Sequence, residues 1–223
     1  MAVLIAGLAA MATGVVLLWP AICDLVVGRG LPDTSLPAAR PAAWAAPLDL
    51  PGAANLYQIG PTLYRGAQPS EEGFRRLAAM GIKTVVNLRA GHDDADDVRG
   101  TGLDYVEIPT QAWSLDDRDV AEFLKVVTDP ARQPVFFHCR LGSDRTGAMA
   151  AAYRVVVQRW PTDAAIEEMT RGGYGFHRAW AGLLDVIRDL PIEDLRRQLG
   201  LTPPAASEPD DRTPRRASEV GVH

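Results

Sequence analysis

Cysteine is scarce in this 223-residue chain, and basic residues do not outnumber acidic ones. Two cysteines, Cys23 and Cys139, are too few for a disulfide-stapled domain, and no Cys/His spacing suggests a structural zinc site. The 23 lysines and arginines face 28 acidic residues, for a net charge of −5. We therefore expect no nucleic-acid partner, although a small site on an acidic protein can still be locally positive.

The first segment, residues 1–27, contains a run without charged residues at positions 2–23. As a helix this run would be about 33 Å long, close to the ~30 Å hydrocarbon core of a bilayer, so we expect a transmembrane anchor. A cleaved signal sequence is the alternative. Arg29 and Arg40 follow the run and no basic residue precedes it, which favours a single-pass membrane protein with a cytoplasmic globular domain.

Three further segments follow from composition. Residues 28–51 are rich in proline and alanine, which is typical of a linker. Residues 52–201 alternate between strand-like and helix-like patterns and form the expected globular domain. Residues 202–223 are rich in Pro, Asp, Glu, Ser and Arg, and we expect a disordered tail.

Within the globular domain, short apolar runs alternate with amphipathic ones. The expected strands cover residues 63–65, 82–88, 103–108 and 135–137, and the expected helices residues 70–80, 116–128, 146–159, 162–170 and 179–190. This alternation predicts an α/β fold, with a central, largely parallel sheet flanked by helices. Ligands of such sheets bind beyond the carboxyl ends of the strands, and Cys139 follows an expected strand there.

The loop HCRLGSDRTG, residues 138–147, has the composition of an anion site. Gly142 allows the backbone to curl so that successive N–H groups point inward, and the helix expected from Thr146 adds further donors. The same donors stabilise a thiolate at Cys139, and Arg145 can grip two phosphate oxygens. These parts suit transfer of a phosphoryl group to sulfur, and the Thr146 hydroxyl can assist the hydrolytic step. A buried structural cysteine and a rhodanese-like sulfurtransferase are the alternatives.

The pattern His-Cys, five residues, then Arg-Thr is similar to that of the protein tyrosine and dual-specificity phosphatase superfamily. The blocks YRGAQPS (64–70), GIKTVVNLR (81–89) and GGYGFH (172–177) resemble bacterial dual-specificity-type members. The resemblance implies the cysteine-phosphatase fold and hydrolysis of phosphomonoesters through a cysteinyl-phosphate intermediate, without metal or organic cofactor. The expected substrate is a phosphorylated protein (phosphotyrosine, phosphoserine or phosphothreonine) or a phosphoinositide or inositol phosphate. A phosphate-binding pseudophosphatase is the alternative from another class.

The resemblance also implies roles for single residues. Cys139 is the nucleophile, Arg145 the phosphate clamp, and His138 a supporting residue that tunes the thiolate. The phosphate cradle consists of the backbone N–H groups of Arg140, Leu141, Gly142, Ser143, Asp144 and Arg145.

Two carboxylates compete for the role of general acid, which must protonate the leaving oxygen. The family places this acid on the loop after the strand that corresponds to residues 103–108, where Asp116 comes late and can instead be a helix-terminal charge. Asp144 precedes Arg145 and is favoured, although it can also brace the loop. Two other residues have an open assignment: Trp113 walls the pocket or packs elsewhere, and His177 lines the pocket or begins a helix.

Overall fold

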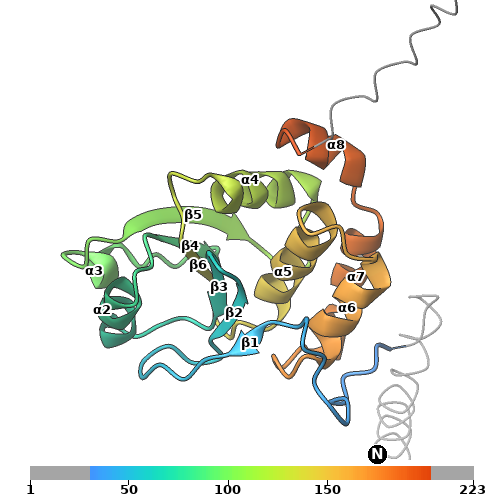
Figure 1. The fold of residues 1–223 in the computed structure, drawn as a ribbon, viewed down its shortest axis with the longest axis horizontal. Helices are drawn as coiled ribbons and strands as arrows, with labels where there is room; N and C mark the ends of the chain where they lie inside the picture. Colours follow the sequence, from blue (N-terminus) through green and yellow to red (C-terminus); the bar gives the residue numbers. More distant parts are fainter. Residues whose placement is uncertain (1–30, 202–223) are drawn as a thin grey trace, which may run out of the picture.

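A mixed six-stranded sheet lies at the centre of the computed structural model, which describes residues 31–201 (Figure 1). Its strands are β1 (Ala46–Pro47), β2 (Tyr57–Gly60), β3 (Leu63–Gly66), β4 (Thr84–Arg89), β5 (Asp104–Thr110) and β6 (Val135–His138). The order is β1-β2-β3-β6-β4-β5, in which β3, β6, β4 and β5 are parallel. We did not predict the edge strand β1 or its neighbour β2. β1 pairs antiparallel with β2, and β2 pairs antiparallel with β3, so the sheet is mixed.

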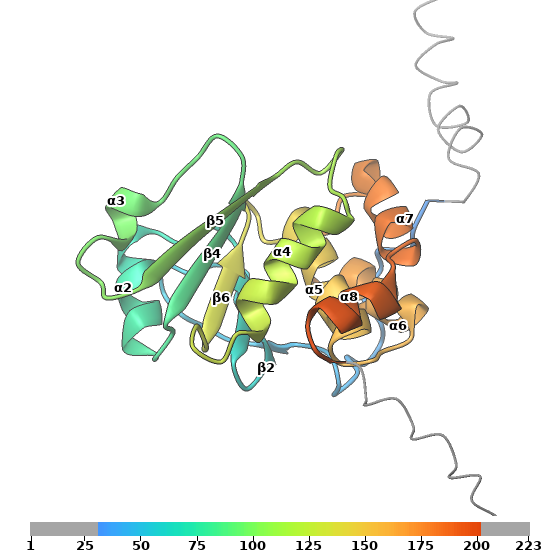
Figure 2. The same cartoon turned by 90° about the horizontal axis from the view of Figure 1, so that it is seen from above.

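Helices cover both faces of the sheet, as Figure 2 shows. One face carries α2 (Glu71–Ala79) and α3 (Ala95–Val98), and the other α4 (Asp117–Thr128) and α5 (Asp144–Val156). Three more helices and one 3-10 turn pack beyond α5: α6 (Thr162–Arg171), η1 (Arg178–Trp180), α7 (Gly182–Arg188) and α8 (Ile192–Gln198). Each face has its own hydrophobic core, and the larger one surrounds α5. This arrangement confirms the α/β class.

Local signals explain where several helices begin. Ser70 caps α2 by accepting a hydrogen bond from the Gly73 amide, and two glutamates occupy the first turn. Asp116 and Asp119 form a reciprocal capping box at the start of α4. Helix α5 begins at Asp144, two positions before the expected start. Asp144 and Arg145 therefore belong to its first turn.

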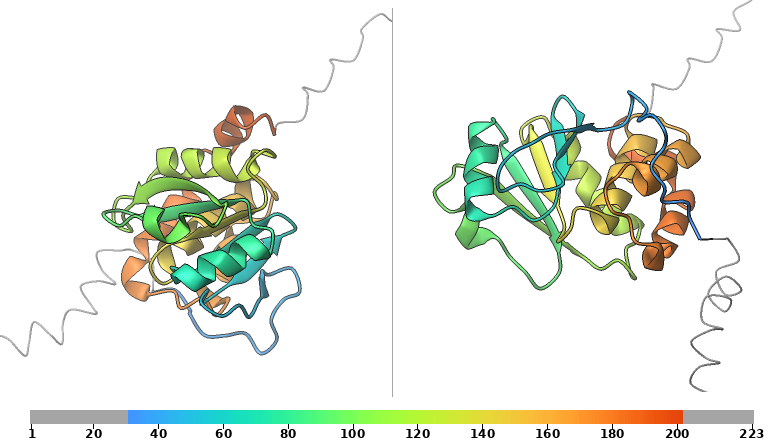
Figure 3. Two further views of the ribbon diagram at one scale, coloured as in Figure 1. Left: turned by 90° about the vertical axis from the view of Figure 1, so that its left-hand side faces the viewer. Right: turned by 90° about the horizontal axis from the view of Figure 1, so that it is seen from below.

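The chain before the globular domain packs against it. Trp44 and Ala45 are buried, although composition predicted a linker over residues 28–51. The Arg40 guanidinium donates hydrogen bonds to the Ala45 carbonyl and the Tyr174 hydroxyl, at 2.7 and 2.8 Å. In the right-hand view of Figure 3 this blue segment runs beside the orange helices before it crosses to the sheet. We call residues 31–47 the N-terminal strap.

The structure corrects the predicted membrane architecture. Among residues 31–201 no helix is long and apolar enough to cross a bilayer. Helix α5, with 13 residues, would extend only about 20 Å, short of the ~30 Å hydrocarbon core. The run at residues 2–23 that suggested an anchor lies outside the described residues, as does the predicted tail 202–223. A fold with a transmembrane helix, and the single-pass membrane location inferred from it, are therefore not supported.

Candidate active site

Cys139 lies at the carboxyl end of the central strand β6, where the chain turns toward α5. It is 3% exposed and is a free cysteine. Gly142 in the loop has φ +71°, and a Cβ atom there would lie 2.5 Å from the carbonyl oxygen of Gly66 in β3. Only glycine fits this close approach in a left-handed conformation. The loop is thus pressed against β3.

Arg65 holds the loop from beneath. Its guanidinium is buried, donates a 2.6 Å hydrogen bond to the Gly142 carbonyl and lies 3.8 Å from the ring centre of Tyr174. Burial lowers the pKa of Arg65, while the nearby Tyr174 and Glu168 raise it. The sequence alone gave us no role for Arg65, because its burial depends on distant parts of the chain.

Arg145 is fixed by the ends of two parallel strands. Its Nη1 donates to the carbonyls of Leu88 in β4, at 3.2 Å, and Thr110 in β5, at 3.0 Å. The Nε and Nη2 groups have no hydrogen-bond partner among residues 31–201, so a bidentate grip on an anion stays available. The guanidinium is therefore held in place before any ligand binds.

A pocket of about 390 Å³ opens above Cys139. Its lining joins the loop, the segment after β5 and the segment after α6. The lining residues are Gln111, Ala112, Trp113, Cys139, Arg140, Leu141, Asp144, Arg145, His177, Ala179 and Trp180. The predicted residues Cys139, Arg140, Leu141, Asp144 and Arg145 meet here, while Gly142 and Ser143 are buried in the loop behind them.

The two candidate acids lie in different places. Asp144 lines the pocket and contacts His177, whose backbone N–H donates to Oδ1 at 2.8 Å and whose Nδ1 lies 2.9 Å from Oδ2. Asp116 borders a separate hollow and accepts hydrogen bonds from the Arg118 and Asp119 amides. Bonding to the Asp119 amide, with Arg118, holds the pKa of Asp116 below its usual value despite some burial. Its contacts are those of a helix cap.

The turn that carries His177, residues 172–177, is bonded to the loop. The Ser143 hydroxyl and the Asn55 side-chain amide both donate to the Tyr174 carbonyl, at 2.7 and 3.0 Å. Asn55 also donates to the Leu141 carbonyl at 2.9 Å. Gly173 and Gly175 have φ +79° and +80°, which lets the turn reverse beside the loop. The glycine-rich block was visible in the sequence, but its contact with the loop was not.

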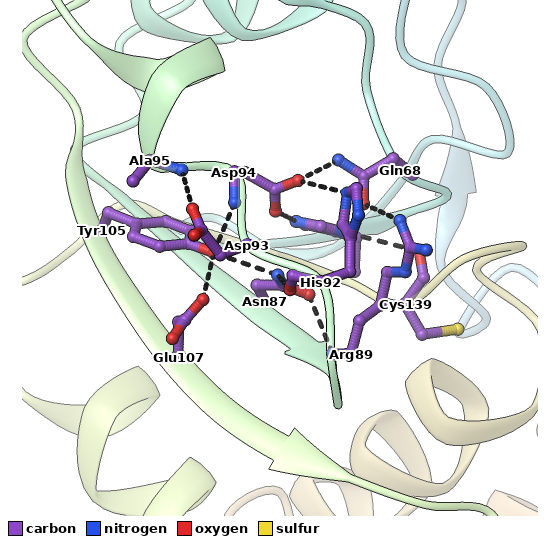
Figure 4. Close-up of polar contacts among 11 residues, drawn as sticks. Gln68, Asn87, Arg89, His92, Asp93, Asp94, Ala95, Tyr105, Glu107 and Cys139 are labelled. Atoms are coloured by element: carbon purple, nitrogen blue, oxygen red, sulfur yellow. Dashed lines mark hydrogen bonds and ion pairs between the residues drawn. The ribbon is translucent and has the colours of Figure 1, made fainter.

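A buried polar network lies behind the nucleophile (Figure 4). His138 is fully buried, with Nδ1 3.3 Å from the Cys139 carbonyl oxygen and Nε2 3.2 Å from Oδ2 of Asp94. Asp94 Oδ1 accepts a hydrogen bond from Gln68 and lies 3.2 Å from Nε2 of His92. Burial raises the pKa of Asp94, but hydrogen bonding and charge attraction from His138 outweigh it, so the net shift is downward.

This network includes one member of the acidic run at residues 92–97. Asp94 is only 1% exposed and pairs with the histidine next to Cys139. A single buried aspartate cannot be told from its exposed neighbours without the tertiary structure. Thr146, the other supporting residue, is fully buried, and its hydroxyl has no hydrogen-bond partner within the described chain.

Comparison with known proteins identifies relatives of this chain. Residues 57–175 match the family described as "DSP-PTPase phosphatase fused to NAD+ Kinase". The dual specificity protein phosphatase TpbA of Pseudomonas aeruginosa (strain UCBPP-PA14) is 36% identical over 172 residues, which are 77% of this chain and 78% of TpbA.

Solved structures agree with this match. A P. aeruginosa TpbA structure is 34% identical, with a TM-score of 0.65 over 73% of this chain and 99% of that one. A Cys-to-Ser variant of TpbA in complex with phosphotyrosine is 33% identical, with a TM-score of 0.65 over 74% and 100%. The Saccharomyces cerevisiae Siw14 catalytic domain shares the fold, at 21% identity and a TM-score of 0.61 over 70% and 98%. The similarity to TpbA favours a phosphatase over a rhodanese-like sulfurtransferase.

Proposed function

Because this chain belongs to the dual-specificity phosphatase family, and is thereby a cysteine-dependent phosphomonoester hydrolase, we propose that it acts on phosphotyrosyl substrates in the pocket above Cys139. The observation that carries this proposal is the aromatic rim of that pocket. Trp113 is 71% exposed, and its ring centre lies 6.1 Å from that of Trp180. An exposed tryptophan beside an anion site offers a flat apolar surface to the ring of a phosphorylated tyrosine.

In the proposed reaction the Cys139 thiolate attacks phosphorus, and the bond from phosphorus to the tyrosyl oxygen breaks. The free Nε and Nη2 groups of Arg145 and the loop N–H groups of residues 140–145 neutralise the charge on the phosphoryl oxygens. Water then attacks the cysteinyl phosphate and releases inorganic phosphate and the thiolate. The Thr146 hydroxyl, buried without a partner among the described residues, supports the departing thiolate.

The substrate proposal follows from the balance of apolar and cationic groups. Leu141, Ala112 and Ala179 extend the apolar rim, and Leu141 is 52% exposed. The arginines of the lining are Arg140 and Arg145. A single phosphate on an aromatic ring suits this lining better than an inositol ring with many phosphates. The structure of TpbA with phosphotyrosine, at 33% identity, supports the same preference.

The test is a comparison of kcat/KM for one peptide phosphorylated on Tyr, Ser or Thr, together with inositol hexakisphosphate and phosphoinositide vesicles. We expect the phosphotyrosyl peptide to be preferred, and Cys139→Ser to abolish turnover. Trp113→Ala should lower kcat/KM for that peptide about 2- to 10-fold, the value of one aromatic contact.

Met80→Ala is the matched control, because Met80 is also exposed but lies at the end of α2, away from the pocket. It should leave all rates unchanged. Faster turnover of an inositol phosphate would reject the phosphotyrosyl proposal and would assign the exposed Arg140 to a multiply charged substrate. Phosphopeptide binding without Cys139-dependent turnover would indicate a pseudophosphatase.

A further inference from the structure

Three side chains lining the pocket can carry and release a proton in the proposed reaction: Cys139, Asp144 and His177. Cys139 is the nucleophile. The lining arginines stay charged throughout. The donor to the leaving oxygen therefore comes from the pair Asp144 and His177.

The geometry of this pair assigns different parts to its members. Both Asp144 oxygens act as acceptors, Oδ1 for the backbone N–H of His177 and Oδ2 for the ring nitrogen Nδ1. Nδ1 also lies 3.2 Å from Oδ1, so His177 contacts both oxygens of the carboxylate. When an ionised Asp144 accepts from Nδ1, the ring hydrogen of this contact is on Nδ1, and Nε2 is the ring nitrogen left to exchange a proton. Within residues 31–201, Nε2 of His177 has no hydrogen-bond partner.

We propose that His177 is the proton donor to the leaving group, and that Asp144 is a positioning residue which orients its imidazole. As the phosphorus–oxygen bond breaks, the Nε2 proton of the imidazolium moves to the tyrosyl oxygen, and neutral His177 is left. In the second step Nε2 accepts a proton from the attacking water as the sulfur–phosphorus bond breaks. The imidazolium and the thiolate are thus restored together.

The position of His177 agrees with this role. The turn at residues 172–177 is bonded to the loop through Asn55 and Ser143, so the histidine is held at the pocket wall. The side chain is about half exposed, which leaves it open to substrate and solvent. The other histidine near the nucleophile, His138, is fully buried and does not line the pocket.

The experiment uses p-nitrophenyl phosphate, whose leaving group needs little protonation, and phosphotyrosine, whose leaving group needs it. His177→Asn should reduce kcat for phosphotyrosine by about 10²-fold or more, the usual size of a general-acid contribution. The loss with p-nitrophenyl phosphate should be much smaller. Added imidazole should restore turnover of phosphotyrosine in His177→Gly, because it replaces the donor.

Asp144→Asn should give a smaller loss with the same dependence on the leaving group. Arg178→Ala, at the next position and outside the pocket lining, should keep the wild-type ratio between the two substrates. The proposal is overturned by equal losses with both substrates in His177→Asn. It is also overturned if only Asp144→Asn loses phosphotyrosine turnover, since the carboxylate would then be the donor.

This inference rests on the proposed function, and the two fail in distinguishable ways. Wild-type hydrolysis of p-nitrophenyl phosphate that Cys139→Ser abolishes upholds the cysteine chemistry whatever the His177 variants do. A thermal unfolding curve of each variant identifies any that fail to fold, and His177→Gln is then the replacement test, with the same expected loss.

Discussion

Replacing Gly142 with alanine tests whether the loop is pressed against β3. Two costs are expected. A left-handed conformation costs a residue with a Cβ atom about 1–2 kcal/mol. The added methyl group would also lie 2.5 Å from the Gly66 carbonyl and 2.6 Å from the Ala67 nitrogen, and overpacking of this kind costs about 1–3 kcal/mol.

Gly100 separates the two costs. It has φ +78°, close to the +71° of Gly142, but a Cβ atom there would meet nothing within 4 Å. Gly100→Ala should therefore show only the conformational cost. Urea unfolding of both variants should place Gly142→Ala about 1–3 kcal/mol below Gly100→Ala in free energy of unfolding.

Activity gives a second, independent measurement. Relief of the contact with β3 must displace the loop, and a shift of about 1 Å in a catalytic group can cost about 10²-fold in rate. We expect that loss in kcat/KM for Gly142→Ala and none for Gly100→Ala. Equal unfolding midpoints together with a wild-type rate in Gly142→Ala would refute the close approach of loop and strand.

Two further predictions concern the aspartates outside the pocket. Asp116→Ala should cost about 1 kcal/mol in urea unfolding through loss of the α4 cap, with no change in the ratio of phosphotyrosine to p-nitrophenyl phosphate turnover; a selective loss with phosphotyrosine would restore Asp116 as the acid. The pKa of Asp94 is lower in the folded protein than in the unfolded chain, where it is about 4. The ionised carboxylate therefore stabilises the fold above the pKa of the unfolded chain, and this stabilisation is lost as pH falls through the pKa of the folded protein. Asp94→Asn should therefore flatten the acid limb of stability below about pH 5, measured as urea midpoints across pH, and parallel curves for variant and wild type would contradict the buried pair with His138.

Sequence reasoning succeeded where local spacing determines the structure. The run of residues 135–137 followed by Cys139, Gly142 and Arg145 specifies a strand, a curled loop and a helix start within a short stretch of chain. The cap at Ser70 and the apolar face of α4 are equally local, and the predicted ranges 70–80 and 116–128 agree with α2 and α4 to within one residue at each end. The helix predicted over residues 179–190 is instead divided into η1 and α7.

It failed where function depends on contacts between distant segments. Arg65, Asp94 and Asn55 gave no signal, because their roles arise from burial and pairing across the sheet. β1 has only two residues and exists through its pairing with β2, so no periodicity could reveal it. The sequence also could not decide between Asp116 and Asp144 as general acid, because the pocket that only Asp144 lines is built by three separate segments of the chain.

The N-terminal strap is bonded to the turn at residues 172–177, which carries His177. Arg40 bonds to Gly172 and Tyr174, and the Ala45 amide donates to Glu168, the same carboxylate that receives the Tyr174 hydroxyl and pairs with buried Arg154. The strap and the loop thus grip the turn from opposite ends. A protein that begins at residue 52 would keep every pocket-lining residue but lose the hydrogen bonds of Arg40 and Ala45 to this region. The turn that carries His177 would then be held by its contacts with the loop and Asn55.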